Sequence, residues 1–402
     1  QAQHGLPIKV RNRTRLRNIA QRELIHVEEE LLKQTILLND NAPVSAHSPK
    51  QVAEFIYGKL QFRKAFRLRK TKHGNTRTLT SDDDAIREHI QKYPQYKLVL
   101  LNILEARKRR HDLSTYIDAQ ETTLPNGDTI FEYSLNITGT VSGRFSAGLL
   151  IDKKTGIAAQ GIPKRLRYMI GREGCLVCES DSSQAEARVV AWISGEESLI
   201  KDFLSGVDAH KVTASLLFDV PITEVTKLQR ELAKRVKHAS NYWIGWSKLT
   251  EVVHEYFPDY PFSAADAKYF IAKLKELYPK TYQWGLGIQK QMETGTRVFY
   301  SHFGKLRLFM GPITGESIRS AISFVPQSDV GELTIQAGIR VQKRLLTLGL
   351  DPVKNCLINR VHDSLVGLCQ PEYVSLVHAI TKEEMSANIP NLTFNGTPLS
   401  IP

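Results

Sequence analysis

The stretch from Cys175 to Gly195 constrains the fold of this 402-residue chain more than any other. An apolar run at Cys175–Cys178 leads to Asp181, and apolar residues at helical spacing follow from Ala185. This order predicts a buried strand, a turn and an amphipathic helix. The Asp181 carboxylate would then stand at the end of a strand, where it could cap the helix or bind a metal ion.

Asp181 is followed by Ser183-Gln184-x-Glu186-x-Arg188 and then by Ser194-Gly195. This pattern resembles motif A of the family A DNA polymerases, the bacterial DNA polymerase I type. The resemblance implies that Asp181 and the backbone carbonyl of Ser182 bind metal, and that Gln184 and Glu186 contact an incoming nucleotide. Glu186 would lie under the sugar, where its bulk excludes a 2′-hydroxyl and favours deoxyribonucleotides.

The charge of the chain favours a polyanionic partner. The formal net charge is +12 and the pI is near 9.4, with basic clusters at 9–22, 63–77 and 107–110. One such cluster could be a solvated surface, but three clusters near the N-terminus favour nucleic acid. No apolar run reaches the ~18 residues that a membrane span needs, so we expect no membrane partner.

The four cysteines, at 175, 178, 356 and 369, raise the question of a zinc site. They lie in apolar, strand-like segments without the glycine-rich loop of a zinc knuckle. We therefore expect buried thiols in a reducing compartment. The cytoplasm fits this best, or the host cytoplasm for a viral or phage protein, with an organelle as the alternative.

The first 128 residues predict helices joined by basic segments. Apolar spacing favours helices at 23–38, 51–60 and 98–112, with Ser48 as the N-cap of the second. Another helix would begin after Ser81 or Asp82, behind a basic loop. The loop and the sequences SPKQ and STYID resemble the thumb of family A polymerases. Without that resemblance, a helical bundle with a basic face fits equally well.

Residues 129–137 are strand-like, and the Gly- and Thr-rich turn at 138–146 holds Arg144. Such a turn lets the backbone approach a phosphodiester chain closely. It resembles the family's TxTGRxS element, with serine for the second threonine. Gln160-Gly161 resembles the family's QNIP element, with glycine for asparagine. The resemblance assigns Arg144 and Gln160 to DNA binding.

A long predicted helix carries Arg230, Lys234, His238 and Tyr242, each four residues from the next. The spacing places all four along one face, which suits a triphosphate below a stacked base or a solvated basic stripe. The pattern resembles motif B of the same family. It implies that Arg230 and Lys234 hold phosphates and that Lys234 could protonate pyrophosphate. His238 replaces the family's phenylalanine, and two extra residues separate Tyr242 from the following glycine.

Three other segments extend the resemblance. His210 lies in a DxHxxTA element, which implies contact with the nucleotide phosphates. Residues 298–310 resemble the family's LFGRRR hairpin. Gln327 stands where the family has a minor-groove glutamine, and Arg319 lies on the same predicted helix. Minor-groove contacts of this kind check the geometry of a base pair rather than its sequence.

The sequence CLINRVHDSLVGL, which begins at Cys356, predicts a tight β-hairpin with His362 and Asp363 at its tip. It resembles motif C, which implies that Asp363 is the second metal-binding aspartate and that His362 contacts DNA. The family has a glutamate next, whereas this chain has Ser364. Glu179, which precedes Asp181, is no obvious substitute.

The motifs follow the family's order over about residues 40–400. They imply an α+β right-hand fold with an antiparallel palm sheet. Residues 1–40 would be a basic, helical N-terminal segment, 41–128 the thumb, 129–195 and 298–402 the palm, and 196–297 the fingers. The departures at Gly161, Ser364 and after Tyr242 resemble a viral or plasmid branch.

The resemblance implies a template-directed DNA polymerase that joins dNTPs to the 3′-hydroxyl of a primer and releases pyrophosphate. Its partners would be primer-template DNA, dNTP and two Mg²⁺ ions, with Mn²⁺ as a substitute. The alternatives are a reverse transcriptase, a single-subunit RNA polymerase and a non-catalytic DNA-binding subunit. Exonuclease, helicase or primase regions would lie upstream of Gln1 or on another chain.

Overall fold

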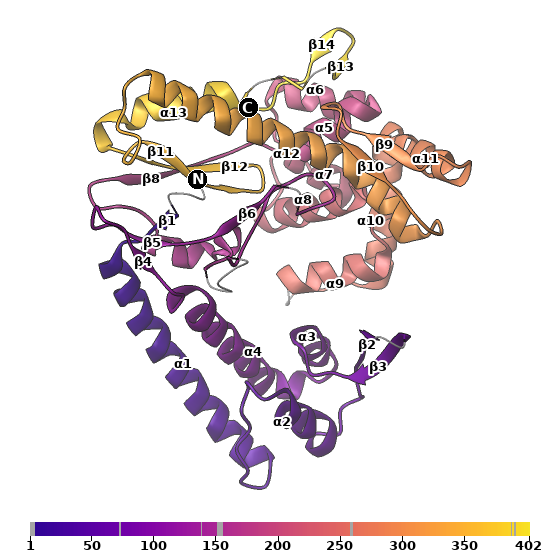
Figure 1. The fold of residues 1–402 in the computed structure, drawn as a ribbon. Coiled ribbons are helices and arrows are strands. Elements are labelled where there is room, and N and C mark those ends of the chain that lie inside the picture. The colour runs from indigo at the N-terminus through magenta and orange to yellow at the C-terminus, as the bar shows by residue number, and fades with distance from the viewer. Residues whose placement is uncertain are drawn as a thin grey trace. The chain divides into compact units, whose positions relative to one another are not determined.

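The structure is a computed structural model that describes residues 5–71, 74–137, 139–150, 156–257, 260–386, 388–389 and 391–402. The chain forms two compact units (Figure 1). The first contains residues 134–148 and 172–402, and the second contains residues 5–133 and 149–171. None of the described helices combines the length and the apolar character needed to cross a membrane.

The second unit is mainly helical. Its helices are α1 (Val10–Leu38), α2 (Pro49–Ala53), α3 (Asp83–Lys92) and α4 (Lys97–His111), and π-helical turns at Glu54–Lys59 and Asp112–Ile117 extend α2 and α4. α1 and α4 pack side by side (Figure 1). Ser48 caps α2 as predicted, and Asp82 rather than Ser81 caps α3 by accepting a hydrogen bond from the backbone N–H of Ala85.

Helix α1 begins 13 residues before the predicted start, at Val10 instead of residue 23. The reason is a tertiary contact, because Arg13 is buried and donates hydrogen bonds to the carbonyls of Ile117 and Ala119. The basic segment before α3 also departs from its prediction as a loop. It forms a hairpin of β2 (Phe66–Thr71) and β3 (Gly74–Leu79).

The strand predicted at 129–137 is broken into two. β5 (Thr129–Phe131) lies between β1 (Leu6–Pro7) and β4 (Thr122–Thr123) in the second unit, and short 3₁₀ turns follow at 159–161 and 164–169. β6 (Ser134–Asn136) pairs with β7 (Ser146–Gly148) in the first unit. The break arises because the carbonyl of Glu132 accepts a hydrogen bond from Ile157 instead of a strand partner.

The first unit contains a three-stranded antiparallel sheet in the order β11 (Cys356–Val361), β12 (Ser364–Cys369), β8 (Leu176–Asp181). Helices α12 (Gly315–Thr347) and α13 (Val374–Met385) pack on it. Apolar residues of both helices form a core with Leu357, Leu365 and Cys369 of the sheet, and Cys178 packs against this core. The prediction of a buried strand is wrong for β8, because strand side chains alternate and its other face is exposed at Val177, Glu179 and Asp181.

Most of the remaining helices of the first unit form a second core around the apolar side of α8. These helices are α5 (Ala185–Ser194), α6 (Glu197–Ser205), α7 (Ala209–Phe218), α8 (Lys227–Asn241), α9 (Trp246–Tyr256) and α10 (Ala264–Leu277), whereas α11 (Pro279–Glu293) packs in another core with α12. The hairpin predicted at 298–310 forms as β9 (Val298–Tyr300) and β10 (Leu306–Leu308), and β13 (Thr393–Phe394) pairs with β14 (Thr397–Pro398). The mixture of helices with small antiparallel sheets confirms the predicted α+β class.

Candidate functional site

Asp181 and Asp363 come together at one end of the three-stranded sheet. Asp181 is the last residue of β8, and Asp363 lies in the turn between β11 and β12. The strand register places Ser364 directly opposite Asp181, and the backbone N–H of Ser182 donates to the carbonyl of Asp363 at 3.3 Å. The two predicted strand ends are therefore neighbours in space, although far apart in sequence.

The pKa of Asp363 shows that several charges converge on this point. Burial of the carboxyl raises its pKa, and the negative charges of Asp181 and Glu186 raise it as well, while Arg144 lowers it. Two neighbouring carboxylates that repel one another provide the oxygen ligands that Mg²⁺ prefers. Among the described residues, no three His, Cys, Asp or Glu side chains form a ready-made metal cage. The two carboxylates thus fit a hard cation that also keeps water or substrate ligands.

Glu186, in the first turn of α5, is held from two sides. One carboxylate oxygen pairs with Nη2 of Arg144, and the other accepts a hydrogen bond from the hydroxyl of Tyr242. Burial raises the pKa of Tyr242 well above its usual value, and the charge of Glu186 raises it further. Tyr242 is therefore a neutral donor, and Glu186 is the carboxylate that it orients.

Arg144 reaches Glu186 past the backbone of α12. A Cβ at Gly331 would lie 3.0 Å from Cγ of Arg144, so a glycine at this position leaves room for the arginine. Arg360 contacts the same glycine, since its Nη1 donates to the carbonyl of Gly331 at 3.0 Å. Its guanidinium lies over the ring of Phe145. Burial, together with the charge of Arg144, lowers the pKa of Arg360 to about 10.

Sequence reasoning missed Arg360 as a supporting residue of the site. The available signal was a single charged residue inside a mainly apolar strand, two residues before His362. A charge in such a strand is expensive unless neighbouring groups pair with it. The partners that justify it, Gly331 and Phe145, come from distant parts of the chain.

A cationic group forms where α7 meets α8. Nε of Arg230 donates to Asp208 at 2.7 Å, and the same carboxylate group caps α7. His210 is buried in the first turn of α7, and burial together with Lys234 and Arg230 lowers its pKa to about 4. The imidazole is therefore neutral near pH 7, whereas Arg230 and the exposed Lys234 supply positive charge.

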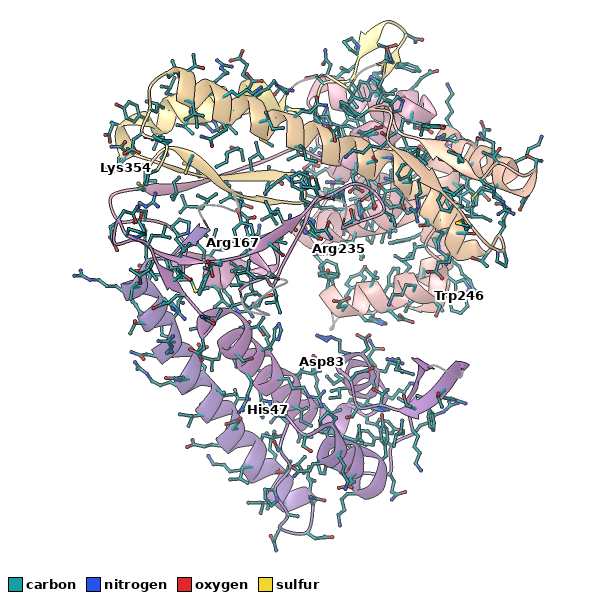
Figure 2. The ribbon with its side chains drawn as sticks, in the orientation of Figure 1. His47, Asp83, Arg167, Arg235, Trp246 and Lys354 are labelled. Atoms are coloured by element: carbon teal, nitrogen blue, oxygen red, sulfur yellow. The ribbon has the colours of Figure 1, made fainter. Side chains whose placement is uncertain are left out.

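The predicted face of α8 is present for Arg230, Lys234 and His238, but the prediction that Tyr242 belongs to the helix is wrong, because α8 ends at Asn241 and Tyr242 is its C-terminal cap. Lys234 and His238 are exposed, and the His238 ring meets the Tyr242 ring edge-on with centroids 5.5 Å apart. Arg235, labelled in Figure 2, stacks over Tyr256 of α9 instead, with 3.3 Å between its guanidinium carbon and the ring centroid. The face that carries the predicted residues is thus separate from the face that packs on α9.

Trp243, one of the two residues inserted after Tyr242 relative to the motif B pattern, has a packing role. Trp243, at the end of α8, has a positive φ of 57° and lies against α11. A Cβ at Gly285 would come within 2.7 Å of its indole, and its ring centroid is 5.4 Å from that of Tyr282. The extra residue therefore anchors the end of α8, next to Tyr242.

The remaining predicted site residues lie at other places in the fold. His362 is exposed at the tip of the β11–β12 hairpin with φ of 54°. Gln184 precedes α5 with φ of 54°, and its buried Oε1 has no hydrogen-bond partner among the described residues. Arg319 and Gln327 both lie on α12, the first exposed and the second half-buried. Gln160 belongs to the other compact unit.

Glu179 is an additional carboxylate on the exposed face of β8. Its Oε1 lies 3.3 Å from Oγ of Ser364, the residue that follows Asp363. Of the turn predicted at 138–146, the structure describes residues 139–146, and Thr138 is outside the described part.

Comparisons with known proteins agree with this geometry. Residues 14–400 match the model of DNA polymerase family A. The chain is 29% identical to the thermostable DNA polymerase I of Thermus aquaticus over 307 residues, which cover 73% of this chain and 34% of that protein. It is 27% identical to DNA polymerase I of Chloroflexus aurantiacus over 378 residues, which cover 92% of this chain and 38% of that protein.

A solved structure has the same fold. The POL domain of Pol1 from M. smegmatis, in complex with DNA primer-template and dNTP, superposes with a TM-score of 0.77 at 20% identity. The match covers 99% of this chain and 66% of that one. The chain spans little more than a third of the length of the two polymerases above. The family match extends over nearly all of its residues, and the chain belongs to DNA polymerase family A.

Proposed function

We propose that this chain catalyses template-directed addition of deoxynucleotides to the 3′ end of a primer, with release of pyrophosphate. The observation that carries the proposal is that Asp181 and Asp363 lie next to one another at one end of the β11–β12–β8 sheet, close to Glu186. Family membership supports it, as does the structural similarity to the M. smegmatis domain in complex with DNA primer-template and dNTP.

Asp181, Asp363 and the backbone carbonyl of Ser182 would hold two Mg²⁺ ions, for which Mn²⁺ could substitute. Bound there, the ions would activate the primer hydroxyl and neutralise the triphosphate. All three donors are oxygen atoms, and the mutual repulsion that raises the pKa of Asp363 would be relieved by a bound cation.

The cationic group at the start of α8 would bind the triphosphate. Arg230 is held by Asp208, so its guanidinium is already oriented before a nucleotide arrives. Lys234 is exposed on the same face and would contact the phosphates and protonate the leaving pyrophosphate. His210 is neutral near pH 7 and would act as a hydrogen-bonding group rather than as a cation.

Glu186 and Tyr242 would select the sugar, with the bulk of Glu186 under the sugar excluding a 2′-hydroxyl. His238 and Tyr242 would pack against the base, and Gln184 would contact the nucleotide. The DNA would be contacted by residues from several elements, namely Arg144, Gln160, Arg319, Gln327 and His362. In this proposal residues 41–128 form the thumb, 196–297 the fingers, and 129–195 with 298–402 the palm.

Primer extension on a DNA template with Mg²⁺ tests the proposal. We expect extension with dNTPs, little with rNTPs, and none by Asp363→Ala, which should still bind the duplex. Extension with rNTPs instead would favour an RNA polymerase, and a preference for an RNA template would favour a reverse transcriptase. Duplex binding without extension under any condition would indicate a DNA-binding subunit and contradict the proposal.

A further inference from the structure

The sheet face that carries Asp181 also carries the carboxylate of Glu179. Residues two apart on a strand point to the same face, so Glu179 and Asp181 share one side of β8. Cys178, between them, packs into the core beneath α12 and α13. The shared face is therefore the one turned away from that core, and both acids are exposed on it.

Ser364 connects Glu179 with the tip of the hairpin. It is the register partner of Asp181 and the next residue after Asp363, and it is 2% exposed. Its hydroxyl lies 2.9 Å from the carbonyl of Val361 and 3.3 Å from Oε1 of Glu179. A hydroxyl has one proton, so Ser364 can donate fully to only one of these acceptors at a time.

The position after Asp363 therefore holds a small hydroxyl group, which contacts the carboxylate of Glu179 on the neighbouring strand. A glutamate side chain is long enough to reach across one strand spacing, as the contact with Ser364 demonstrates. Motif spacing could not reveal this pairing, because the two residues are 185 positions apart.

We propose that Glu179 is a positioning residue of the Asp181–Asp363 site and adds a further negative charge to it from β8. The inference rests on the proposed function. Ser364 would hold the carboxylate in place, and Glu179 would act through its charge and not as a direct ligand, since the described residues contain no group of three metal-binding side chains. Its expected effect is a higher affinity of the site for divalent cations.

The test is a titration of the full chain with Mn²⁺, in which free Mn²⁺ is followed by electron paramagnetic resonance. A primer-template with a dideoxy-terminated primer and a matching dNTP is present, so that no turnover occurs. Replacing a partner outside the ligand shell typically weakens metal binding 10–100-fold. We expect Glu179→Gln to raise the Mn²⁺ dissociation constant about tenfold, and Glu179→Asp to raise it less.

Glu173→Gln is the matched control. It removes the same charge from an exposed residue that precedes β8, at the opposite end of the strand from Asp181. It should leave the dissociation constant unchanged. The decisive variant adds Ser364→Glu to Glu179→Gln, which moves the acid from β8 to β12. If Glu179 acts by charge at this place, the double variant should recover most of the lost Mn²⁺ affinity, which a general folding defect would not do.

The outcomes separate this inference from the function on which it rests. An unchanged Mn²⁺ affinity in Glu179→Gln, together with loss of binding in Asp363→Ala, would overturn the role of Glu179 alone. Unchanged binding in Asp363→Ala would overturn the proposed metal site itself. A Glu179→Gln defect that Ser364→Glu fails to restore would mean that Glu179 acts by a contact specific to β8, which also contradicts the proposal.

Discussion

The hydroxyl of Tyr242 donates a hydrogen bond to Oε2 of Glu186, joining the end of α8 to the first turn of α5 across 56 residues of sequence. Arg144 pairs with the other carboxylate oxygen, so the orientation of Glu186 is set by two partners. Burial raises the pKa of Tyr242, which keeps the phenol protonated and able to donate. A carboxylate restrained in this way can act as a steric boundary.

The first prediction concerns sugar selection. Glu186→Ala removes the bulk expected under the sugar, so we expect the ratio of dNTP to rNTP incorporation to fall roughly ten- to hundredfold, a typical effect of reshaping a binding pocket. Single-nucleotide extension kinetics with dNTP and rNTP would measure it. Glu186→Gln keeps the volume and is the control, since it should retain most of the discrimination. Unchanged discrimination in Glu186→Ala would remove this role.

The second prediction separates two roles of Lys234. Lys234→Met loses both charge and proton, so KM for dNTP should rise and kcat should fall, the latter by about a hundredfold or more for loss of a general acid. Lys234→Arg keeps the charge, and its KM should stay near the parental value while kcat remains low. The exposed Lys227, at the start of α8, provides the control Lys227→Met. A parental kcat in Lys234→Arg would limit Lys234 to phosphate binding.

The third prediction tests how Trp243 anchors the end of α8. Gly285→Ala would place a methyl group 2.7 Å from the indole, so overpacking should destabilise the fold by about 1–3 kcal/mol. In a Trp243→Ala background the clash is gone, and the same substitution should stabilise α11 by up to about 1 kcal/mol through helix propensity. Thermal unfolding of the parent and the three variants would show this change of sign.

Gly287 supplies the control for that cycle, because it lies on the same helix with nothing within 4 Å of a Cβ. Gly287→Ala should be mildly stabilising in both backgrounds. If Gly285→Ala has the same effect with and without the indole, the packing of Trp243 against α11 is not what holds the end of α8.

Local sequence patterns were sufficient for much of the fold. The apolar run before Asp181, the hairpin tip at His362 and Asp363, and the four-residue spacing from Arg230 each describe a single strand, turn or helix. Such features depend on neighbours in sequence, so periodicity and turn chemistry reveal them. Ser48 as a helix cap belongs to the same class.

Contacts between distant segments could not be predicted in this way. The α1 helix starts early because Arg13 binds carbonyls more than 100 residues away, and Arg144 meets Glu186 through a gap left by Gly331. The contact between Glu179 and Ser364 depends on the register of two strands, which neither strand specifies alone. The viral or plasmid branch stays a prediction, as do the roles of the individual site residues.

The last prediction concerns the buried side-chain amine of Lys237 in α8. Lys237 is 5% exposed, donates to Oδ1 of Asn241 at 2.8 Å, and lies 4.2 Å from the centroid of the Tyr278 ring. It lines a cavity of about 220 Å³ with Ser240 and other residues of α8, α10 and α11. Burial lowers the pKa of Lys237 to about 7, although the charge of Glu196 acts in the opposite direction.

A lowered pKa makes stability depend on pH in a defined direction. Between pH 7 and about 10.4, the usual lysine value, the unfolded chain binds a proton at Lys237 that the folded chain lacks. Stability should therefore rise with pH across this window, and below pH 7 the full cost of burying the charge remains. Lys237→Met removes that cost, so the variant should be more stable than the parent, by about 1–3 kcal/mol at pH 6.5 after loss of the Asn241 hydrogen bond.

Melting temperatures at pH 6.5, 8 and 9.5 measure the effect. The advantage of Lys237→Met over the parent should be largest at pH 6.5 and smallest at pH 9.5, because the folded parent no longer carries the buried charge at high pH. Lys227→Met, on the exposed start of the same helix, should show a difference that does not vary over this range. An advantage of Lys237→Met that stays constant or grows toward pH 9.5 would mean that the amine is not held neutral by burial.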